Sequence, residues 1–333
     1  MRNHDRFTFV TFGLMLGCLL AVPMTAAAQG EHPRTPDGQP DLQGVWNFSS
    51  ATPMERPDAL VGKETLTAEE AAEWEQDLAN TRAANESENE NAPLQARVGY
   101  SVRVWFEDGV SLTDQRTALV IDPPNGKIPP LTESATRDRA EKAAAREGTG
   151  PHEPTPGGWV DDLGPTGLQV RCITGFNSGP PMAPSAYNNN VQLFQTPDHV
   201  VLLNEMNHNA RIIPIDGRDH IDLKQWTGDS RGYWDGDTLV IETMNFLRET
   251  SFMQGGSGPK MHLTERFTRV SPESLMYEAT VNDPETWTRP WTFQVSMNQI
   301  ADPVYEYACH EGNYAMAVIL ASAIAGDNSD GSE

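Results

Sequence analysis

Residues 191–215 read VQLFQTPDHVVLLNEMNHNARIIPI, and this stretch decides the fold class. Its apolar runs at 191–195, 199–206 and 211–215 have the length of strands and are rich in valine, isoleucine and leucine. Thr196-Pro197-Asp198 forms a turn signal between the first two runs, and asparagine-rich residues 204–209 interrupt the apolar sequence before the third. The stretch therefore predicts short strands joined by tight turns.

The same pattern of short strands separated by turns extends over the rest of the second half of the chain. Turn signals recur at Asp216-Gly217 and Ser271-Pro272, and residues 233–237 predict a tight hairpin with Asp229 and Arg231 ion-paired at its base. Evenly punctuated short strands favour an antiparallel barrel or sandwich. We predict a mostly β protein, a single antiparallel lipocalin-like β-barrel with a few peripheral helices. Further strands are expected at 41–48, 98–106, 118–121, 238–243, 262–270, 275–281, 291–297 and 305–309.

Some stretches outside these strands have helical sequence. Thr67 and Glu70 have the spacing of a capping box, which predicts a helical insertion near 65–80. A second insertion is expected at 132–146, where the sequence is polar on every side and so favours the protein surface. Residues 85–91 are nearly all asparagine, glutamate and serine, which predicts a surface loop. A short apolar helix is expected at 314–325.

The N-terminus has the pattern of a secretory signal peptide. Two arginines precede an apolar run at 7–22, and the small residues Ala26 and Ala28 favour cleavage after position 28. The alternative is a lipoprotein with its lipid on Cys18, although apolar residues continue directly after that cysteine. We expect residues 1–28 to be a signal peptide, 29–326 to form one β-barrel domain and 327–333 to be a disordered acidic tail. The protein is then periplasmic or secreted.

The charge balance excludes some classes of partner. The chain has 24 Lys and Arg against 47 Asp and Glu, a net charge of −23, and therefore repels nucleic acid and anionic lipid surfaces. The apolar runs at 7–22 and 314–325 are too short for a stable membrane span. The expected partner is a small molecule, with no nucleic acid and no membrane span after signal cleavage.

Two cysteines, Cys172 and Cys309, lie outside the signal peptide. In an oxidising compartment such a pair predicts a disulfide, and two unrelated buried thiols are the alternative. A bridge would tie the middle of the chain to its end and favour a single domain.

Two polar clusters contain the candidate catalytic residues. In the first, Glu205 and His208 fall on opposite faces of an extended strand, so they act together only if the strand breaks between them. Arg211 follows and could stabilise developing negative charge. The second cluster adds His310 and Glu311 as acid/base groups. The first cluster could instead be a hairpin end that faces water.

A divalent metal such as zinc is an open alternative to metal-free chemistry. His208, His310 and Glu311 supply nitrogen and oxygen ligands of the kinds that zinc binds. Their spacing matches no standard metal motif, so an acid/base site without metal is the other interpretation.

Other residues are candidates for ligand binding. Consecutive asparagines before a strand bind ligands or form turns, and indole rings beside an arginine stack on flat ligands or pack at a barrel mouth. Glu265 and Arg269 alternate with apolar residues, which predicts either an inward salt bridge or two side chains lining a pocket. The ligand-binding candidates are Asn188, Asn190, Asn207, Asn209, Trp287, Arg289, Trp291 and Tyr307.

Several longer motifs resemble a family of uncharacterised secreted bacterial proteins. They are RTPDGQPDL (34–42) with GVW (44–46), YNNNVQLFQTPDHVV (187–201), ARIIPIDG (210–217), GDSR (228–231) with GDTLV (236–240), ERF (265–267), TWTRPWT (286–292) and YEYACHEGN (305–313). The resemblance spans nearly the whole mature chain and implies secretion, but it implies no particular activity. Gly44 and Trp46 are also similar to the opening of lipocalin-type barrels, which implies an interior that holds an apolar ligand.

These inferences combine into two functional hypotheses. The first is a secreted enzyme of the hydrolase or lyase type, acting by acid/base chemistry on a small organic or sugar-derived substrate in an internal pocket. His208 or His310 would be its general base. Glu205 or Glu311 would orient or share the proton, and Arg211 with nearby asparagines would stabilise negative charge. The second hypothesis is a periplasmic lipocalin-like binding or carrier protein without catalysis.

Overall fold

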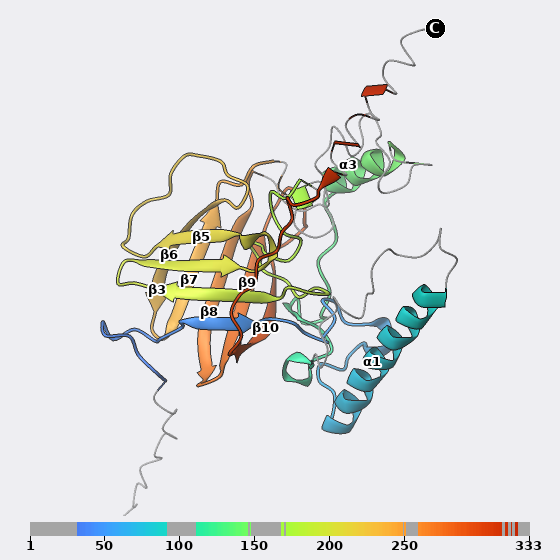
Figure 1. The fold of residues 1–333 in the computed structure, drawn as a ribbon, viewed down its shortest axis with the longest axis horizontal. Helices are drawn as coiled ribbons and strands as arrows, with labels where there is room; N and C mark the ends of the chain where they lie inside the picture. Colours follow the sequence, from blue (N-terminus) through green and yellow to red (C-terminus); the bar gives the residue numbers. More distant parts are fainter. Residues whose placement is uncertain are drawn as a thin grey trace, which may run out of the picture. The chain divides into compact units, whose positions relative to one another are not determined.

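A single large sheet dominates the computed structural model (Figure 1). The structure describes residues 32–91, 111–145, 147, 168–169, 171–248, 250, 259–314, 317–318, 321 and 324–325. The predictions for residues 1–28, 98–106 and 327–333 lie outside these residues.

The sheet has ten antiparallel strands. Nine of them follow the order β5-β4-β3-β1-β10-β9-β8-β7-β6, and β2 pairs with β10 beside this path. Most neighbours in the sheet are also neighbours in the sequence, as tight hairpins require. The strands are β1 (Gly44–Asn47), β2 (Val120–Asp122), β3 (Asn190–Gln195), β4 (His199–Asn204), β5 (Ala210–Pro214), β6 (Asp229–Asp235), β7 (Thr238–Met244), β8 (His262–Ser271), β9 (Ser274–Asn282) and β10 (Trp291–Ile300).

The prediction of a mostly β, antiparallel fold is confirmed, but the predicted closed barrel is not. The strands β5 and β6 are the two ends of the hydrogen-bonded order, and within the described residues no backbone ladder joins them. Pro214 in β5 lacks an N–H group, as is common on edge strands. The two edges nevertheless approach at Gly232 of β6, where an added Cβ would lie 2.7 Å from Cγ2 of Ile215. Glycine permits this approach because it carries no side chain.

The hairpin of β6 and β7 confirms a more local prediction. Tyr233 pairs with Val240 in its register, and Arg231 Nη1 lies 2.7 Å from Asp229 Oδ1 at the base. This ion pair is well shielded, since the Asp229 side chain is 5% exposed.

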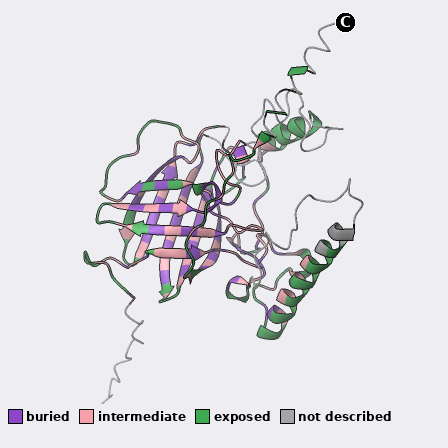
Figure 2. Ribbon diagram, in the orientation of Figure 1, coloured by how far each residue is buried: buried purple, intermediate pink, exposed green. Residues whose placement is uncertain are grey.

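Alternating burial along the strands builds the core. Figure 2 shows buried residues alternating with more exposed ones across the sheet. The buried side chains include aromatic rings from neighbouring strands, and each fully buried ring of this size contributes about 1.5–3 kcal/mol to stability. The largest buried side chains are Trp46, Trp291, Tyr277, Phe48, Phe246, Phe267 and Phe293.

The inward residue Arg269 does not form a salt bridge with Glu265, which was one of the two predicted arrangements, because Glu265 pairs with Arg211 instead. Its guanidinium carbon lies 5.3 Å from the centre of the Trp46 ring, within reach of a cation–π interaction. Its nitrogens donate to the backbone oxygens of Asp41, Ser271 and Pro272. Arg269 therefore fixes the segment that precedes β1 to the end of β8.

Helices lie outside the sheet, and one of them is longer than predicted. The capping box is confirmed, because Thr67 N donates to Glu70 Oε2 at 2.9 Å and Glu70 N donates to Thr67 Oγ1 at 3.2 Å. Helix α1 (Ala68–Asn91) continues through residues 85–91, so the predicted surface loop there is wrong. Polar residues lower helix propensity by less than about 0.7 kcal/mol each, which is too little to end a helix that is already nucleated.

The remaining helical segments are short. Helix α3 (Glu133–Ala144) matches the predicted polar surface helix, with Thr132 Oγ1 accepting from Ala135 N at its start. The 3-10 turns are η1 (Asp58–Leu60), η2 (Thr113–Gln115) and η3 (Met206–His208). No helix within the described ranges has the length and apolar content of a membrane span.

Candidate functional site

A broken strand end places several candidate residues. Strand β4 ends at Asn204, two residues earlier than predicted, and η3 turns the chain back toward β5. Asn207 and His208 have φ angles of 57° and 42°, in the left-handed region that asparagine tolerates better than most residues. The asparagine-rich sequence thus breaks the strand between Glu205 and His208, the condition for their acting together.

This turn packs against a second turn at residues 175–178. Asn204 Nδ2 donates to the Ser178 carbonyl oxygen at 2.6 Å, and Asn209 Nδ2 donates to Ser178 Oγ at 3.3 Å. Gly175 has no room for a side chain, because an added Cβ would overlap the side chain of Met206. Ser178 and Asn204 are 26 positions apart, so two separate segments of the chain pack together here.

Three buried amides from these turns form what we call the asparagine cluster, Asn177, Asn204 and Asn207. Their exposed fractions are 1%, 3% and 6%. Asn177 Oδ1, Asn204 Oδ1 and both polar atoms of Asn207 have no hydrogen-bond partner within the described part of the chain. Each unpaired buried polar group costs about 1–3 kcal/mol, so native proteins keep such groups at few places, functional sites among them.

The side-chain nitrogen of Asn177, unlike its oxygen, has hydrogen-bond partners. Its Nδ2 donates to the carbonyl oxygens of Tyr187 and Asn188 at 3.0 and 3.1 Å. This amide therefore holds the loop before β3 against the turn at 175–178. The asparagines 188–190 act mainly as structure: Asn188 has a φ angle of 53°, and Asn189 is completely buried.

Glu205 ends a short chain of side-chain hydrogen bonds. Asn47 Nδ2 donates to Asn190 Oδ1 at 2.9 Å, and Asn190 Nδ2 donates to Glu205 Oε2 at 2.7 Å. The other carboxylate oxygen accepts the Tyr305 backbone N–H at 3.2 Å. Glu205 is 4% exposed and thereby fastens residues 303–313, the C-terminal segment, to the turn after β4.

Replacing Glu205 tests this attachment. Glu205→Ala is expected to lower the free energy of unfolding by about 1–3 kcal/mol, because the Asn190 amide and the Tyr305 N–H lose their acceptor. Hydrogen exchange of the Tyr305 amide should accelerate, as measured by mass spectrometry. The exposed Glu306 provides a matched control, Glu306→Ala. Equal exchange at Tyr305 in both variants would show that Glu205 does not hold the segment.

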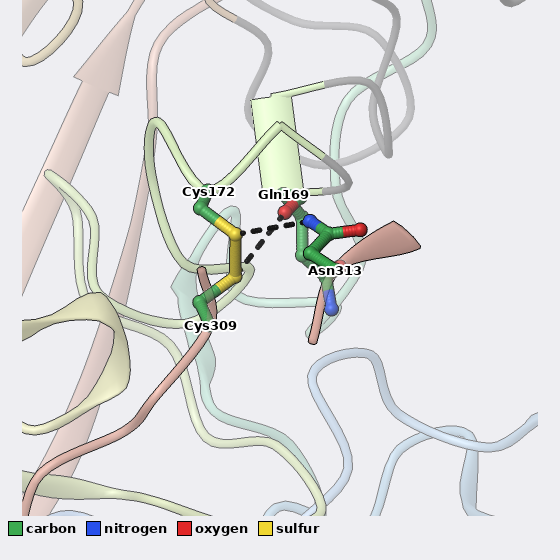
Figure 3. The surroundings of a disulfide bond; sticks show 4 residues. All are labelled: Gln169, Cys172, Cys309 and Asn313. Atoms are coloured by element: carbon green, nitrogen blue, oxygen red, sulfur yellow. Dashed lines mark hydrogen bonds between the residues drawn. A yellow bond between two sulfur atoms is a disulfide. The ribbon is translucent and has the colours of Figure 1, made fainter. Parts of the chain in front are cut away.

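The disulfide predicted between Cys172 and Cys309 is confirmed (Figure 3). Asn313 Nδ2 donates to Cys172 Sγ at 3.4 Å beside the bridge. The C-terminal segment is thus held at two points, Glu205 and Cys172. The predicted strand at 305–309 is absent. This segment does not pair with a neighbouring strand, and the Glu205 carboxylate and the disulfide hold it instead.

A buried ion pair occupies the interior of the curved sheet. Arg211 from β5 forms two hydrogen bonds with Glu265 of β8, at 2.6 and 2.9 Å. Tyr277 Oη donates to Glu265 Oε1 at 2.8 Å and accepts the Met182 N–H at 3.0 Å. Glu265 and Tyr277 are completely buried, and Arg211 is 7% exposed. The pair connects an edge strand to a strand far along the sheet order, so the sheet curves around it.

The surroundings shift the pKa values of two of these groups. Burial raises the pKa of the Tyr277 phenol well above its ordinary value of 10.0, and the Glu265 charge raises it further. For Arg211, burial acts to lower the pKa, but attraction to Glu265 and the hydrogen bonds with it outweigh burial and raise the pKa overall. Both groups therefore keep their protons, and neither is suited to proton transfer near neutral pH.

The raised pKa of Tyr277 predicts a loss of stability in alkali. The folded state binds this proton more tightly than the unfolded state, so the stabilisation is complete below about pH 10 and decreases as the pH rises toward the folded pKa. In this range Tyr277 lowers the free energy of unfolding by at most about 1.4 kcal/mol for each pH unit. Tyr277→Phe is expected to remove this slope in urea unfolding between about pH 9 and 11.

Tyr233 offers a matched control for that measurement, because it is an exposed tyrosine on β6. Tyr233→Phe should leave the alkaline slope of the parent protein unchanged. An identical slope in Tyr277→Phe and the parent would contradict the assignment to Tyr277.

No protein-family model and no curated protein matches this chain.

The candidate catalytic residues differ in exposure and in their partners. Glu205 is buried, whereas His208, His310 and Glu311 are exposed. Arg211 lies in the core, where Glu265 neutralises it. Within the described ranges no three histidine, cysteine, aspartate or glutamate side chains form a group able to hold a metal, so the suggested zinc ligands are not assembled.

The ligand-binding candidates divide into two groups. Asn207 and Asn209 belong to the turn after β4, and Asn188 and Asn190 lie in the adjoining loop and strand. The remaining candidates lie elsewhere: Trp287 and Trp291 are core residues with ring centres 5.5 Å apart, Arg289 pairs with Asp122 on the surface, and Tyr307 is half-buried in the C-terminal segment.

Asn177 and Ser178 were missed by the sequence reasoning. They lie between Gly175 and Gly179, where turn-forming residues are the ordinary interpretation of such a sequence. Only their packing against Asn204 distinguishes this turn from others, and that contact has no local sequence signal.

Proposed function

We propose that this chain is a secreted small-molecule binding protein that holds a polar ligand at the asparagine cluster without transforming it. One observation carries the proposal: four amide atoms of Asn177, Asn204 and Asn207 are buried and unpaired at the junction of two turns. A ligand that pairs with them recovers the cost of their burial. Because these atoms have almost no accessible surface, the two turns must separate for a ligand to reach them.

The charges around the cluster favour binding over acid/base catalysis. A general base needs a titratable group within hydrogen-bond reach of the reacting atom. Both oxygens of Glu205 already accept hydrogen bonds, and the exposed His208 has no carboxylate partner among the described contacts. Neutral amides bind and orient a ligand but do not exchange protons with it at neutral pH.

We further propose that the sheet forms a lipocalin-like wall that closes through side chains. The contact between Gly232 and Ile215 brings β5 and β6 together, and the pair of Arg211 with Glu265 ties the wall across its interior. The disulfide of Cys172 with Cys309 supports secretion to an oxidising compartment such as the periplasm.

Native purification tests the function. The protein is secreted with its own leader, purified without denaturation and analysed by native mass spectrometry and elemental analysis. We expect a bound organic molecule that is recovered unchanged. Asn207→Gly keeps the left-handed backbone and removes the amide, so it should lower occupancy at least about tenfold. Asn282→Ala, at an exposed asparagine of β9, is the matched control and should retain the molecule.

Two outcomes would overturn the proposal. Recovery of a chemically converted molecule would establish an enzyme instead of a binding protein. Absence of any bound molecule, together with no binding from a broad panel of added compounds, would remove the asparagine cluster as a ligand site.

A further inference from the structure

We propose that residues 305–309 form a strap that clamps the turn at 175–178 to the turn after β4, at 206–208, and that reduction of the disulfide releases this clamp. The inference rests on the proposed function for its purpose, because these two turns bury the asparagine cluster and must separate before a ligand reaches it. The opening of the turns is measured without a ligand, so the two proposals can fail separately.

The strap is attached to a different turn at each end. Its first residue, Tyr305, donates its backbone N–H to Glu205 Oε1 at 3.2 Å, and Glu205 directly precedes the turn after β4. Its last residue, Cys309, is bonded to Cys172, which lies in the segment that leads into the turn at 175–178 (Figure 3). The strap therefore runs from one turn to the other.

Neighbouring contacts support both attachments. Glu205 is 4% exposed, and its other carboxylate oxygen accepts Asn190 Nδ2 of β3 at 2.7 Å. Beside the bridge, the Cys172 N–H donates to the Gln169 carbonyl oxygen at 2.8 Å, and Asn313 Nδ2 donates to Cys172 Sγ at 3.4 Å. Since neither end is loose, the strap limits how far the two turns separate while both attachments hold.

The side-chain contacts between the two turns are reversible. Asn204 Nδ2 donates to the Ser178 carbonyl oxygen, and Asn209 Nδ2 donates to Ser178 Oγ. These hydrogen bonds join neutral groups, and water replaces them at a small net cost. Folded proteins open locally at such places without unfolding as a whole. Within the described residues, the disulfide is the link at this junction that thermal motion does not break.

Burial of the asparagine cluster favours opening once the clamp is released. When the turns are closed, four amide atoms of the cluster have no hydrogen-bond partner in the described part of the chain. Water pairs with these atoms when the turns separate, which offsets part of the cost of the broken contacts. The closed arrangement is therefore held against an unfavourable burial, and the strap supplies part of what holds it.

The bridge has two properties of a disulfide that reductants attack. Neither cysteine is buried, and Cys172 has a φ angle of 54°, in the left-handed region that costs a non-glycine residue backbone energy. Exposed or strained disulfides are the labile and regulatory ones. In an oxidising compartment the clamp is thus closed until a reductant reaches it.

The reductant that this step requires is a dithiol. One of its thiolates attacks a sulfur of the bridge, which forms a mixed disulfide and releases the other cysteine as a thiol. Its second thiolate then attacks the mixed disulfide and releases the first cysteine. Two electrons and two protons pass from the dithiol to Cys172 and Cys309, and the dithiol becomes a disulfide. The strap then stays attached at Glu205 alone, so the turns separate without breaking that contact.

Hydrogen exchange followed by mass spectrometry tests the clamp in the intact protein without a ligand. The parent is compared in its oxidised form and after reduction with dithiothreitol. Amides of the two turns, such as those of Gly175 and His208, should exchange at least about tenfold faster after reduction. Paired amides of β8 and β9 should stay unexchanged over the same period in both forms, because they exchange only when the whole protein unfolds.

Two substitutions at Tyr305 test the other attachment. Tyr305→Pro removes the N–H that Glu205 accepts, whereas Tyr305→Ala removes only the side chain, which is 63% exposed. In the oxidised protein, Tyr305→Pro should accelerate exchange at the two turns as reduction does, and Tyr305→Ala should match the parent. Reduction of Tyr305→Pro should add little, because a strap that is free at one end no longer clamps.

The variant Cys172→Ala/Cys309→Ala is the chemical control. Its two turns should exchange as fast as those of the reduced parent and should not respond to dithiothreitol. A response in this variant would overturn the assignment of the effect to the bridge.

The outcomes separate the clamp from the binding function. Equal exchange at the turns in the oxidised and reduced parent, or additive effects of reduction and Tyr305→Pro, would overturn the clamp. A molecule recovered on native purification would then leave the binding function standing. If the turns open on reduction but the protein carries no molecule and binds none from an added panel, the clamp stands and the binding function is overturned.

Discussion

Replacing Glu265 with glutamine should lower the free energy of unfolding by about 3–5 kcal/mol. The substitution keeps the size of the side chain but removes its charge, so the buried guanidinium of Arg211 loses its counterion. An uncompensated charge in the interior is among the most destabilising changes available to a folded protein. Urea unfolding at neutral pH measures the loss.

A double-mutant cycle shows whether the loss comes from the unpaired charge. Arg211→Met removes the guanidinium, and the double variant Arg211→Met/Glu265→Gln leaves no buried charge at all. The double variant should therefore be more stable than Glu265→Gln alone, which is the signature of coupled residues. If it is less stable, the two side chains contribute through packing and the ion pair is not the source of the effect.

The exposed pair of Arg289 and Asp122 is the matched control. Its two side chains are 50% and 51% exposed, so water and salt screen the attraction between them. Arg289→Met should cost less than about 1 kcal/mol. A similar loss at both pairs would contradict the importance of burial.

Removing the disulfide is expected to have an effect of similar size. The bridge joins residues that are 137 positions apart. In the loop-entropy model, closing a loop of that length in the unfolded chain stabilises the folded state by about 5 kcal/mol, with measured values commonly between about 2 and 5 kcal/mol. The variant Cys172→Ala/Cys309→Ala should lose an amount within this range in urea unfolding.

Reduction of the parent protein provides the control for the substitutions themselves. The reduced parent should match the double alanine variant, and reductant should have no effect on that variant. Limited proteolysis should cut the C-terminal segment faster in both, because its covalent attachment is lost and the Glu205 contact is weaker than a covalent bond. If reduction leaves the free energy of unfolding unchanged, the disulfide does not stabilise the protein by constraining the unfolded chain.

Much of the sheet was predictable from local sequence. The β3 and β4 strands have period-two burial, and a Thr-Pro-Asp turn separates them, so both appear within about two residues of their predicted ends. The capping box at Thr67 predicted where α1 starts but not where it ends, because its last turns carry no stop signal. The absence of backbone pairing between β5 and β6 was not predictable, since it depends on how tightly the whole sheet curves.

The candidate site was only partly predictable. Asparagine-rich sequence at 204–209 indicated that the strand could break there, and in the structure Asn207 lies in that break. The role predicted for Arg211 requires an unpaired guanidinium charge. In the structure Glu265, which is 54 positions away in the sequence, neutralises that charge. For Trp287 and Trp291 the sequence left ligand stacking and packing at a barrel mouth open, and the structure buries both rings in the core, Trp291 in register with Val281 of β9.

By itself the sequence determined the antiparallel strands, the capped helix and the pairing of two cysteines. The strands and the helix follow from the alternation of apolar and polar residues and from turn and capping residues, which act locally. The pairing follows from the number of cysteines, because two cysteines leave only one choice. Only the tertiary structure decided which polar groups are buried together, as Ser178 with Asn204, Arg211 with Glu265 and Tyr305 with Glu205. Such contacts depend on strand register and sheet curvature, because a buried polar atom is satisfied or left unpaired by neighbours that are distant in the chain.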